Sequence, residues 1–143
     1  MSNRKRVLFV CVHNSARSQM AETFLNDLGG EGFEAESAGL EPGSLNPYVV
    51  KVMAEAGYDL SGRSTDAVTD FYNEGRSYDV VVTVCSRDAA EQCPIFPGRG
   101  ARLHWPFDDP SSFEGSEEEK LEFTRKVRDQ IRDRIREFIE DFS

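Results

Sequence analysis

The chain has 143 residues, of which 38% are apolar and 30% are charged, and its formal net charge is −9. This length and composition predict one folded domain over residues 1–143 and exclude a disordered chain. The negative charge argues against a nucleic-acid partner, and any anion site must therefore be built locally from backbone amides and a placed arginine.

The first half of the chain predicts two strands, each followed by a helix. A continuous apolar, β-rich run at residues 6–12 is typical of a central parallel strand. Apolar residues spaced four apart then predict a helix that ends at Gly29 and Gly30. A second short strand fits residues 33–37, and a helix with a proline in its first turn fits residues 46–57.

The first apolar run follows basic residues, so a signal peptide has to be considered. The run is too short to span a bilayer, and no small-residue cleavage site follows it. We therefore expect a cytoplasmic protein without a membrane partner.

The second half of the chain predicts two further strands and a long helix. Residues 61–72 are ambiguous and fit a loop followed by a short helix. Residues 78–84 are nearly all β-branched, and a shorter strand fits residues 102–105. Residues 116–142 predict an amphipathic helix. We interpret its apolar face as core packing; the face consists of Val127, Ile131, Ile135, Phe138 and Phe142.

Strands that alternate with helices predict a parallel sheet covered by helices on both faces. Ligands bind such sheets beyond the carboxyl ends of the strands. Three features are expected at that edge, namely the loop after the first strand, Cys85, and the segment after Trp105.

The loop after the first strand has the residues of an oxyanion site. It begins at Cys11 and continues through Val12, His13, Asn14, Ser15, Ala16, Arg17 and Ser18. Successive N–H groups at a helix start converge on one anion, and Arg17 adds a bidentate, permanently charged donor. The positive field of these N–H groups and of Arg17 favours the thiolate form of Cys11, which makes it a nucleophile. The serine hydroxyls can support this thiolate by hydrogen bonding. Asn14 suits a position with positive φ.

The alternative is a buried cysteine at a strand end beside an unrelated arginine. His13 either lines the site or is an exposed loop residue. Attack by Cys11 on a bound oxyanion also needs an acid for the leaving oxygen. The sequence Asp108-Asp109-Pro110 supplies one at the same edge, or it only forms a turn.

The other two cysteines, Cys85 and Cys93, are not a CxxC pair, and three is an odd count for a secreted disulfide framework. A regular helix between them would hold their Cα atoms about 12 Å apart. A disulfide accepts at most roughly 7 Å, so a redox pair requires a bent or unwinding segment. Otherwise Cys85 packs under the sheet and Cys93 is a surface thiol. Zinc binding is disfavoured because the candidate ligands are scattered.

The segment Val10-Cys-Val-His-Asn-Ser-Ala-Arg-Ser-Gln-Met-Ala-Glu22 resembles the signature of the low-molecular-weight protein tyrosine phosphatases, and most of all their arsenate-reductase branch. The resemblance extends to Glu36-Ser-Ala-Gly39, Val82-Thr-Val-Cys85 and His104-Trp-Pro-Phe-Asp-Asp-Pro110, and so spans nearly the whole chain. It implies a single-domain, doubly wound α/β fold whose parallel four-stranded sheet has the flavodoxin-like strand order.

The resemblance also implies roles for individual residues. Asp109, directly before the proline, becomes the general acid. Cys85 and Cys93 match the redox pair of thioredoxin-coupled arsenate reductases, although seven residues separate them here, one more than in that branch. Arsenate or another tetrahedral oxyanion is then the substrate, and thioredoxin is the partner that supplies electrons. No organic cofactor is required, and we expect a monomer.

Some members of this family hold a structural potassium ion near the loop. The matching positions here are Asn14, Glu22, Ser37, Ser64 and Asp66, with Ser64 in place of the expected threonine. The alternative is that these residues only support the loop through hydrogen bonds.

The main competing function is a phosphotyrosine phosphatase that uses the same loop and acid. Such enzymes have aromatic residues after the Asp-Pro pair, whereas this chain has Ser111 and Ser112, which favours a small inorganic oxyanion. A redox sensor or zinc module would leave Arg17 and Asp109 without a role. A reductase coupled to mycothiol or glutaredoxin would not need Cys93.

Overall fold

The computed structural model describes residues 4–14, 16–41, 43–63, 65–84, 101–108, 110 and 113–142. Its four strands form one sheet in which every pairing is parallel. They are β1 (Lys5–Cys11), β2 (Phe33–Gly39), β3 (Val80–Thr83) and β4 (Ala101–His104), in the order β2-β1-β3-β4. The chain therefore leaves β1 toward one side of the sheet and returns to the other, which confirms the predicted doubly wound arrangement.

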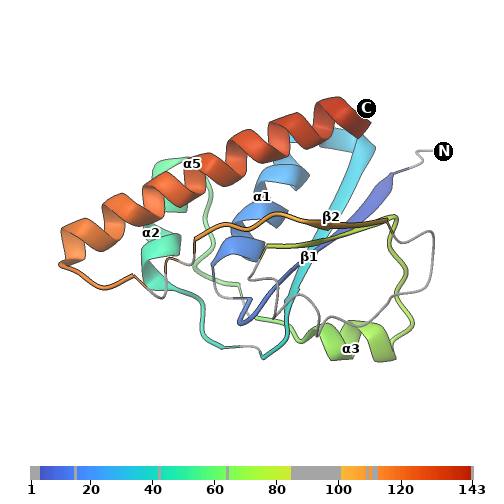
Figure 1. Cartoon of the computed structure of the whole chain (residues 1–143), viewed down its shortest axis with the longest axis horizontal. Helices are drawn as coiled ribbons and strands as arrows, with labels where there is room; N and C mark the ends of the chain where they lie inside the picture. Colours follow the sequence, from blue (N-terminus) through green and yellow to red (C-terminus); the bar gives the residue numbers. More distant parts are fainter. Residues whose placement is uncertain are drawn as a thin grey trace.

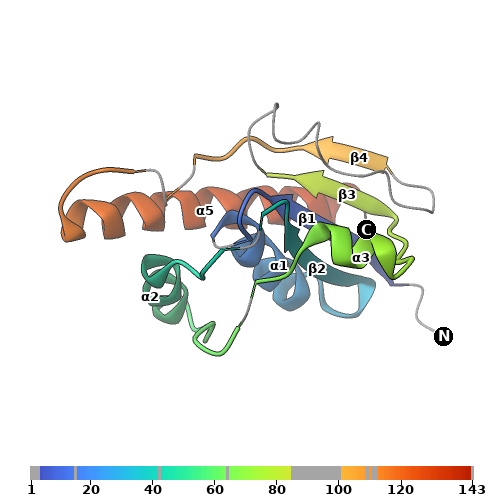
Figure 2. The same cartoon turned by 90° about the horizontal axis from the view of Figure 1, so that it is seen from below.

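Helices cover both faces of this sheet (Figure 1). On one face lie α1 (Arg17–Leu28), α2 (Pro47–Glu55) and the long α5 (Glu117–Phe142), and a short 3-10 turn, η1 (Gly30–Gly32), links α1 to β2. On the other face lies α3 (Val68–Asn73) (Figure 2). Among the described residues, no helix is long and apolar enough to cross a membrane.

Alternate residues of β1 face the two layers, as the two-residue period of a strand requires. Val7, Phe9 and Cys11 belong to the large core under α1 and α5, whereas Leu8 and Val10 pack with α3. Cys11 therefore ends the strand on the same face as α1, the helix that follows it.

The apolar face of α5 closes the large core, as its sequence pattern predicts. Its described members Val127, Ile131, Ile135 and Phe138 are all buried. The Phe138 ring lies 5.5 Å from that of Trp105, which in turn lies 5.9 Å from the ring of Phe9. This aromatic contact joins the last helix to the central strand.

The ends of the elements differ from the predicted ranges by a few residues. The strand predicted at 33–37 extends to Gly39 because Ala38 and Gly39 continue the pairing with Val10 and Cys11. The ambiguous segment 61–72 contains the start of α3. Ala67, the residue directly before α3, is tied to the sheet by a β-bridge to Gly39.

Replacing Ile131 with alanine is expected to lower the free energy of unfolding by about 2–5 kcal/mol, because Ile131 is fully buried on the apolar face of α5. Its neighbour Gln130 is exposed, so Gln130→Ala is the matched control and should change stability little. Denaturant unfolding of both variants measures the difference. Equal losses would contradict the packing of α5 described here.

A pH-dependent contact joins α2 to α5. Glu55 accepts hydrogen bonds from Arg125 at 2.8 Å and Arg128 at 3.2 Å. The hydrogen bond from Arg125, and then its charge, hold the pKa of Glu55 below the ordinary value of 4.5. The stability that this contact contributes is present above the ordinary pKa of Glu55 and is lost as the pH falls through the pKa of Glu55 in the folded state.

Glu55→Gln is therefore expected to lower the melting temperature slightly at neutral pH, since the pair is exposed and screened by solvent. The difference from wild type should vanish well below pH 4.5, where the wild-type carboxyl is protonated as well. Thermal unfolding at both pH values tests this. A difference that persists unchanged in acid would show that the charge plays no part.

Candidate active site

The loop that follows β1 turns around Asn14, and its geometry surrounds one sulfur atom. Asn14 has φ 55°, which confirms the positive φ expected there. Cys11 is 2% exposed. Its Sγ accepts a hydrogen bond from the Asn14 backbone N–H at 3.1 Å and lies 2.9 Å from Ser18 Oγ. Because Asn14 Nδ2 donates to that serine oxygen at 2.8 Å, the hydroxyl hydrogen of Ser18 is available to the sulfur. Both contacts favour a thiolate.

The peptide groups of the loop are oriented by the segment after β2. Three successive loop carbonyls accept backbone hydrogen bonds: Cys11 from Leu40 at 3.1 Å, Val12 from Glu41 at 2.7 Å, and His13 from Gly43 at 3.0 Å. A trans peptide holds its N–H opposite its carbonyl, so the amides of residues 12–14 face the other way, on the side of Cys11 Sγ. Amides that converge in this way form an anion-binding concavity.

Gly39 permits this close approach of loop and strand. A Cβ atom at this position would lie 2.8 Å from Asn14 N and 2.9 Å from Val12 O. Both contacts are with backbone, which cannot move without disturbing the loop. In the sequence, Gly39 lies in one of the segments that resemble the family, and its local signal is a glycine just after the strand predicted at residues 33–37.

Arg17 is the first residue of α1, is 7% exposed, and connects the loop to two other segments. Its Nη1 donates to the carbonyl of Val84 at 3.1 Å and to the carbonyl of Phe107 at 3.0 Å. In the sequence, Val84 directly precedes Cys85 and Phe107 lies two residues before Asp109. One guanidinium nitrogen therefore bonds both the residue directly before Cys85 and the residue two positions before Asp109.

Several predicted site residues lie outside the described residues, namely Ser15, Ser64, Cys85, Cys93 and Asp109. Of the rest, Val12 is half-buried, and Ala16 is buried directly before α1. His13 is exposed, and its Nδ1 lies 2.8 Å from the Glu41 carbonyl oxygen, as suits a loop residue. Asp108 is exposed.

Four of the five positions matched to a potassium ion come together beside α1. Asn14 Oδ1 accepts from the Asp66 backbone N–H at 2.9 Å. Ser37 donates to one carboxylate oxygen of Glu22 through a short hydrogen bond. Burial raises the pKa of Glu22, and the hydrogen bond from Ser37 and the charge of Arg63 oppose that rise.

Sequence reasoning gave no role to two residues that complete this cluster. Gln19 Nε2 donates to Asn14 Oδ1 at 3.2 Å, and Arg63 Nη1 donates to Glu22 Oε2 at 3.0 Å and to Gln19 Oε1 at 3.3 Å. Gln19 is a polar residue on the buried side of α1, which is a usable signal. Arg63 has no comparable local signal, because its partners are more than 40 positions away.

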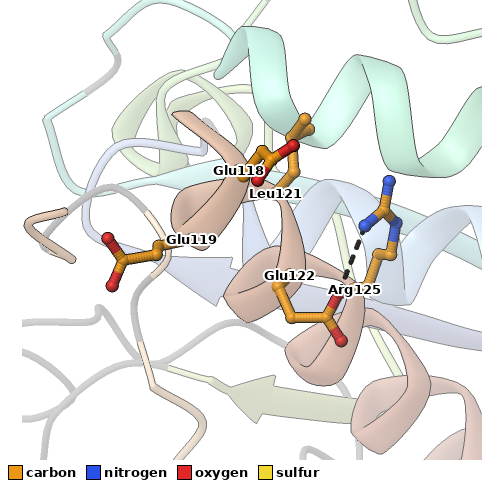
Figure 3. Close-up of a pocket in the computed structure, with 5 residues that line it drawn as sticks. All are labelled: Glu118, Glu119, Leu121, Glu122 and Arg125. Carbon is orange, nitrogen blue, oxygen red and sulfur yellow. Dashed lines mark hydrogen bonds and ion pairs between the residues drawn. The ribbon is translucent and has the colours of Figure 1, made fainter. Parts of the chain in front are cut away.

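A separate hollow lies at the start of α5 (Figure 3). It is lined by Glu118, Glu119, Leu121, Glu122 and Arg125. The lining holds three carboxylates and one arginine, and that arginine is paired with Glu122 at 3.3 Å. An anion would be repelled by this lining, so the hollow is not a second candidate for an oxyanion site.

Gly39→Ala is expected to lower the free energy of unfolding by about 1–3 kcal/mol, because the new methyl group forces the loop away from β2. It should also slow alkylation of Cys11 by iodoacetamide, since the contacts to Sγ shift. Gly32→Ala is the control, because a Cβ there meets no atom within 4 Å. Normal stability and Cys11 reactivity in Gly39→Ala would contradict the close approach.

Comparison with known proteins agrees with this geometry. Residues 6–143 match the family model described as low molecular weight phosphotyrosine protein phosphatase. The arsenate reductase of Bacillus subtilis (strain 168) is 44% identical over 137 residues, which cover 95% of this chain and 96% of that protein.

Solved structures give the same picture. An arsenate reductase in the phosphate-binding state has a TM-score of 0.74 and 32% identity, over 97% of this chain and 99% of that one. The thioredoxin-dependent arsenate reductase of Corynebacterium glutamicum has a TM-score of 0.71 and 29% identity, over 96% of this chain and 60% of that one. With the parallel sheet, the Cys11–Arg17 loop and these matches together, the chain belongs to the low-molecular-weight protein tyrosine phosphatase family.

Proposed function

We propose that this protein reduces arsenate to arsenite through three cysteines, Cys11, Cys85 and Cys93, with thioredoxin as the source of electrons. The observation that carries the proposal is the position of Cys11 Sγ, which receives the Asn14 N–H and faces the Ser18 hydroxyl at the start of α1. That arrangement suits a thiolate which attacks a bound oxyanion. The arsenate reductases among the relatives favour arsenic over phosphorus as the central atom.

In the first step, arsenate occupies the loop, where the amides of residues 12–14 and the Arg17 guanidinium neutralise its charge. Cys11 Sγ forms a bond to arsenic, and one oxygen leaves as water after protonation, with Asp109 as the proton donor. The contact of Arg17 with the Phe107 carbonyl supports this assignment, because it holds the chain two residues before the acid beside the loop.

In the second step, Cys85 forms a bond to the sulfur of Cys11, and the electron pair of the S–As bond passes to arsenic. Arsenate has then gained two electrons and leaves as arsenite, while two thiols have become one disulfide. The contact of Arg17 with the Val84 carbonyl supports the participation of the next residue, Cys85.

In the third step, Cys93 attacks Cys85 and releases Cys11 as a thiol. Reduced thioredoxin then converts the Cys85–Cys93 disulfide back to two thiols and is itself oxidised. All electrons come from thiols, so the loop amides and Arg17 need to supply only charge and position.

The relay is tested by arsenate reduction with thioredoxin, thioredoxin reductase and NADPH. Cys11→Ser is expected to abolish turnover, and Cys93→Ser to slow it at least about tenfold, because thioredoxin then lacks its disulfide substrate. In a single turnover without thioredoxin, Cys93→Ser should still release one equivalent of arsenite. Cys85→Ser should release none.

Two results would overturn the proposal. Wild-type turnover in Cys93→Ser would remove Cys93 from the relay. The second candidate function is hydrolysis of phosphotyrosine through a Cys11 phospho-enzyme, which the family match favours. Cleavage of a phosphotyrosine ester without any reduction of arsenate would establish that function instead.

A further inference from the structure

Arg63 lies outside the Cys11 loop but is connected to it through α1. The segment between α2 and α3 runs beside α1 (Figures 1 and 2). Within it, the Arg63 backbone N–H donates to the Leu60 carbonyl at 3.0 Å. The Arg63 side chain is two-thirds buried, and its Nη1 contacts both Glu22 and Gln19 of α1. An arginine held in this way presents a fixed positive charge to the buried side of the helix.

The hydrogen bonds from Arg63 to Cys11 all run in one direction. Arginine can only donate, so the oxygen of the Gln19 amide faces Arg63 and its NH2 group faces Asn14. The Asn14 oxygen accepts that bond, which directs the Asn14 NH2 group to Ser18. Ser18 Oγ accepts in turn and keeps its hydrogen for the sulfur of Cys11.

This polarity matters for the nucleophile. A hydroxyl that donates to sulfur stabilises the thiolate, whereas a reversed chain would present an acceptor to it. Gln19, Asn14 and Ser18 are all buried, so no water replaces a lost bond at low cost. The backbone N–H of Asp66 also fixes the Asn14 oxygen, so Arg63 shares this task with one other donor.

The same contacts bear on the potassium ion that the family resemblance implies. Three of the oxygens that would bind the ion already accept hydrogen bonds from protein donors: Asn14 Oδ1 from Gln19 and Asp66, and the two Glu22 oxygens from Ser37 and Arg63. Ser37 Oγ in turn uses its hydrogen on Glu22. Among the described residues, this donor set does not fit a monovalent cation while Arg63 holds its place.

We propose that Arg63 is a positioning residue that replaces a bound potassium ion, and that it orients the chain Gln19–Asn14–Ser18 so that Ser18 donates to Cys11. The proposal deepens the proposed function, since it explains how the nucleophile is prepared. What it predicts, however, is the reactivity of Cys11 itself, which can be measured without arsenate or thioredoxin.

The test uses a Cys85→Ser/Cys93→Ser background, in which Cys11 is the only cysteine. Alkylation of Cys11 by iodoacetamide and the melting temperature are measured for Arg63, Arg63→Gln and Arg63→Lys. Each protein is measured in potassium, sodium and tetramethylammonium chloride at equal ionic strength. Arg125→Gln is the matched control, because it removes a guanidinium that is paired with Glu55, far from Cys11 in the α2–α5 contact.

With Arg63 present, both measurements should be the same in all three salts. Arg63→Gln should alkylate about three- to tenfold more slowly in tetramethylammonium, and potassium should restore most of the rate and raise the melting temperature. Arg63→Lys keeps the charge and should retain at least about half of the rate. Arg125→Gln should alkylate at the rate of the Arg63 protein in every salt, and any fall in its melting temperature from the lost Glu55 contact should be the same in all three salts.

Three outcomes would overturn the proposal. The first is a normal alkylation rate in Arg63→Gln. The second is an equal loss in Arg63→Gln and Arg63→Lys, which would show that the charge is not what matters. The third is an effect of potassium on the alkylation rate and melting temperature that is as large with Arg63 as without it. If Arg63→Gln does not fold, the Arg63→Lys rate and its salt response still decide between the alternatives. If the alkylation results are as expected but the cysteine variants show no three-cysteine relay, only the proposed function is contradicted.

Discussion

The geometry of the site depends on the bonds of one fully buried residue, Asn14. Its backbone N–H reaches Cys11, its amide NH2 group reaches Ser18, and its amide oxygen receives Gln19 and Asp66. The end of β1, the start of α1 and the segment before α3 are thereby joined through one residue. Each lost bond would leave a buried polar group unsatisfied, at a cost of about 1–3 kcal/mol. The loop is therefore held in one conformation from several directions.

The charge of the protein and the charge of the site have opposite signs. The chain as a whole carries −9, and the hollow at the start of α5 is lined by glutamates. Around Cys11 the groups are N–H donors and the guanidinium of Arg17. Exposed charges are screened within about 10 Å at ordinary ionic strength, whereas buried donors are not. Selection of an anion therefore takes place at contact distance, with no long-range attraction to assist it.

The local parts of this structure could be predicted from the sequence. The strand at 6–12, the helix at 116–142, the positive φ of Asn14 and the position of Arg17 at the start of α1 depend on neighbours within a few residues. These patterns also imply the parallel sheet, since strands and helices alternate.

The parts that the sequence did not reveal depend on distant contacts. The extension of β2 to Gly39 is decided by its pairing with β1, and α3 is tied to the sheet through the Gly39–Ala67 bridge. Gly39 is needed because a loop from another part of the chain approaches it. Arg63 meets Gln19 of α1 across 44 positions of the sequence. No periodicity carries such information, because the partners are separated by tens of residues.

Arg17 has a consequence for how this family can diversify. Its two partners are main-chain carbonyls, of Val84 and Phe107, and every amino acid supplies the same carbonyl. The attachment to the loop therefore does not depend on which side chains these two positions carry. Residues that follow β3 and β4 can therefore be exchanged without loss of the bonds that tie both segments to the start of α1. The scaffold separates the loop around Cys11 from the segments that it holds in place.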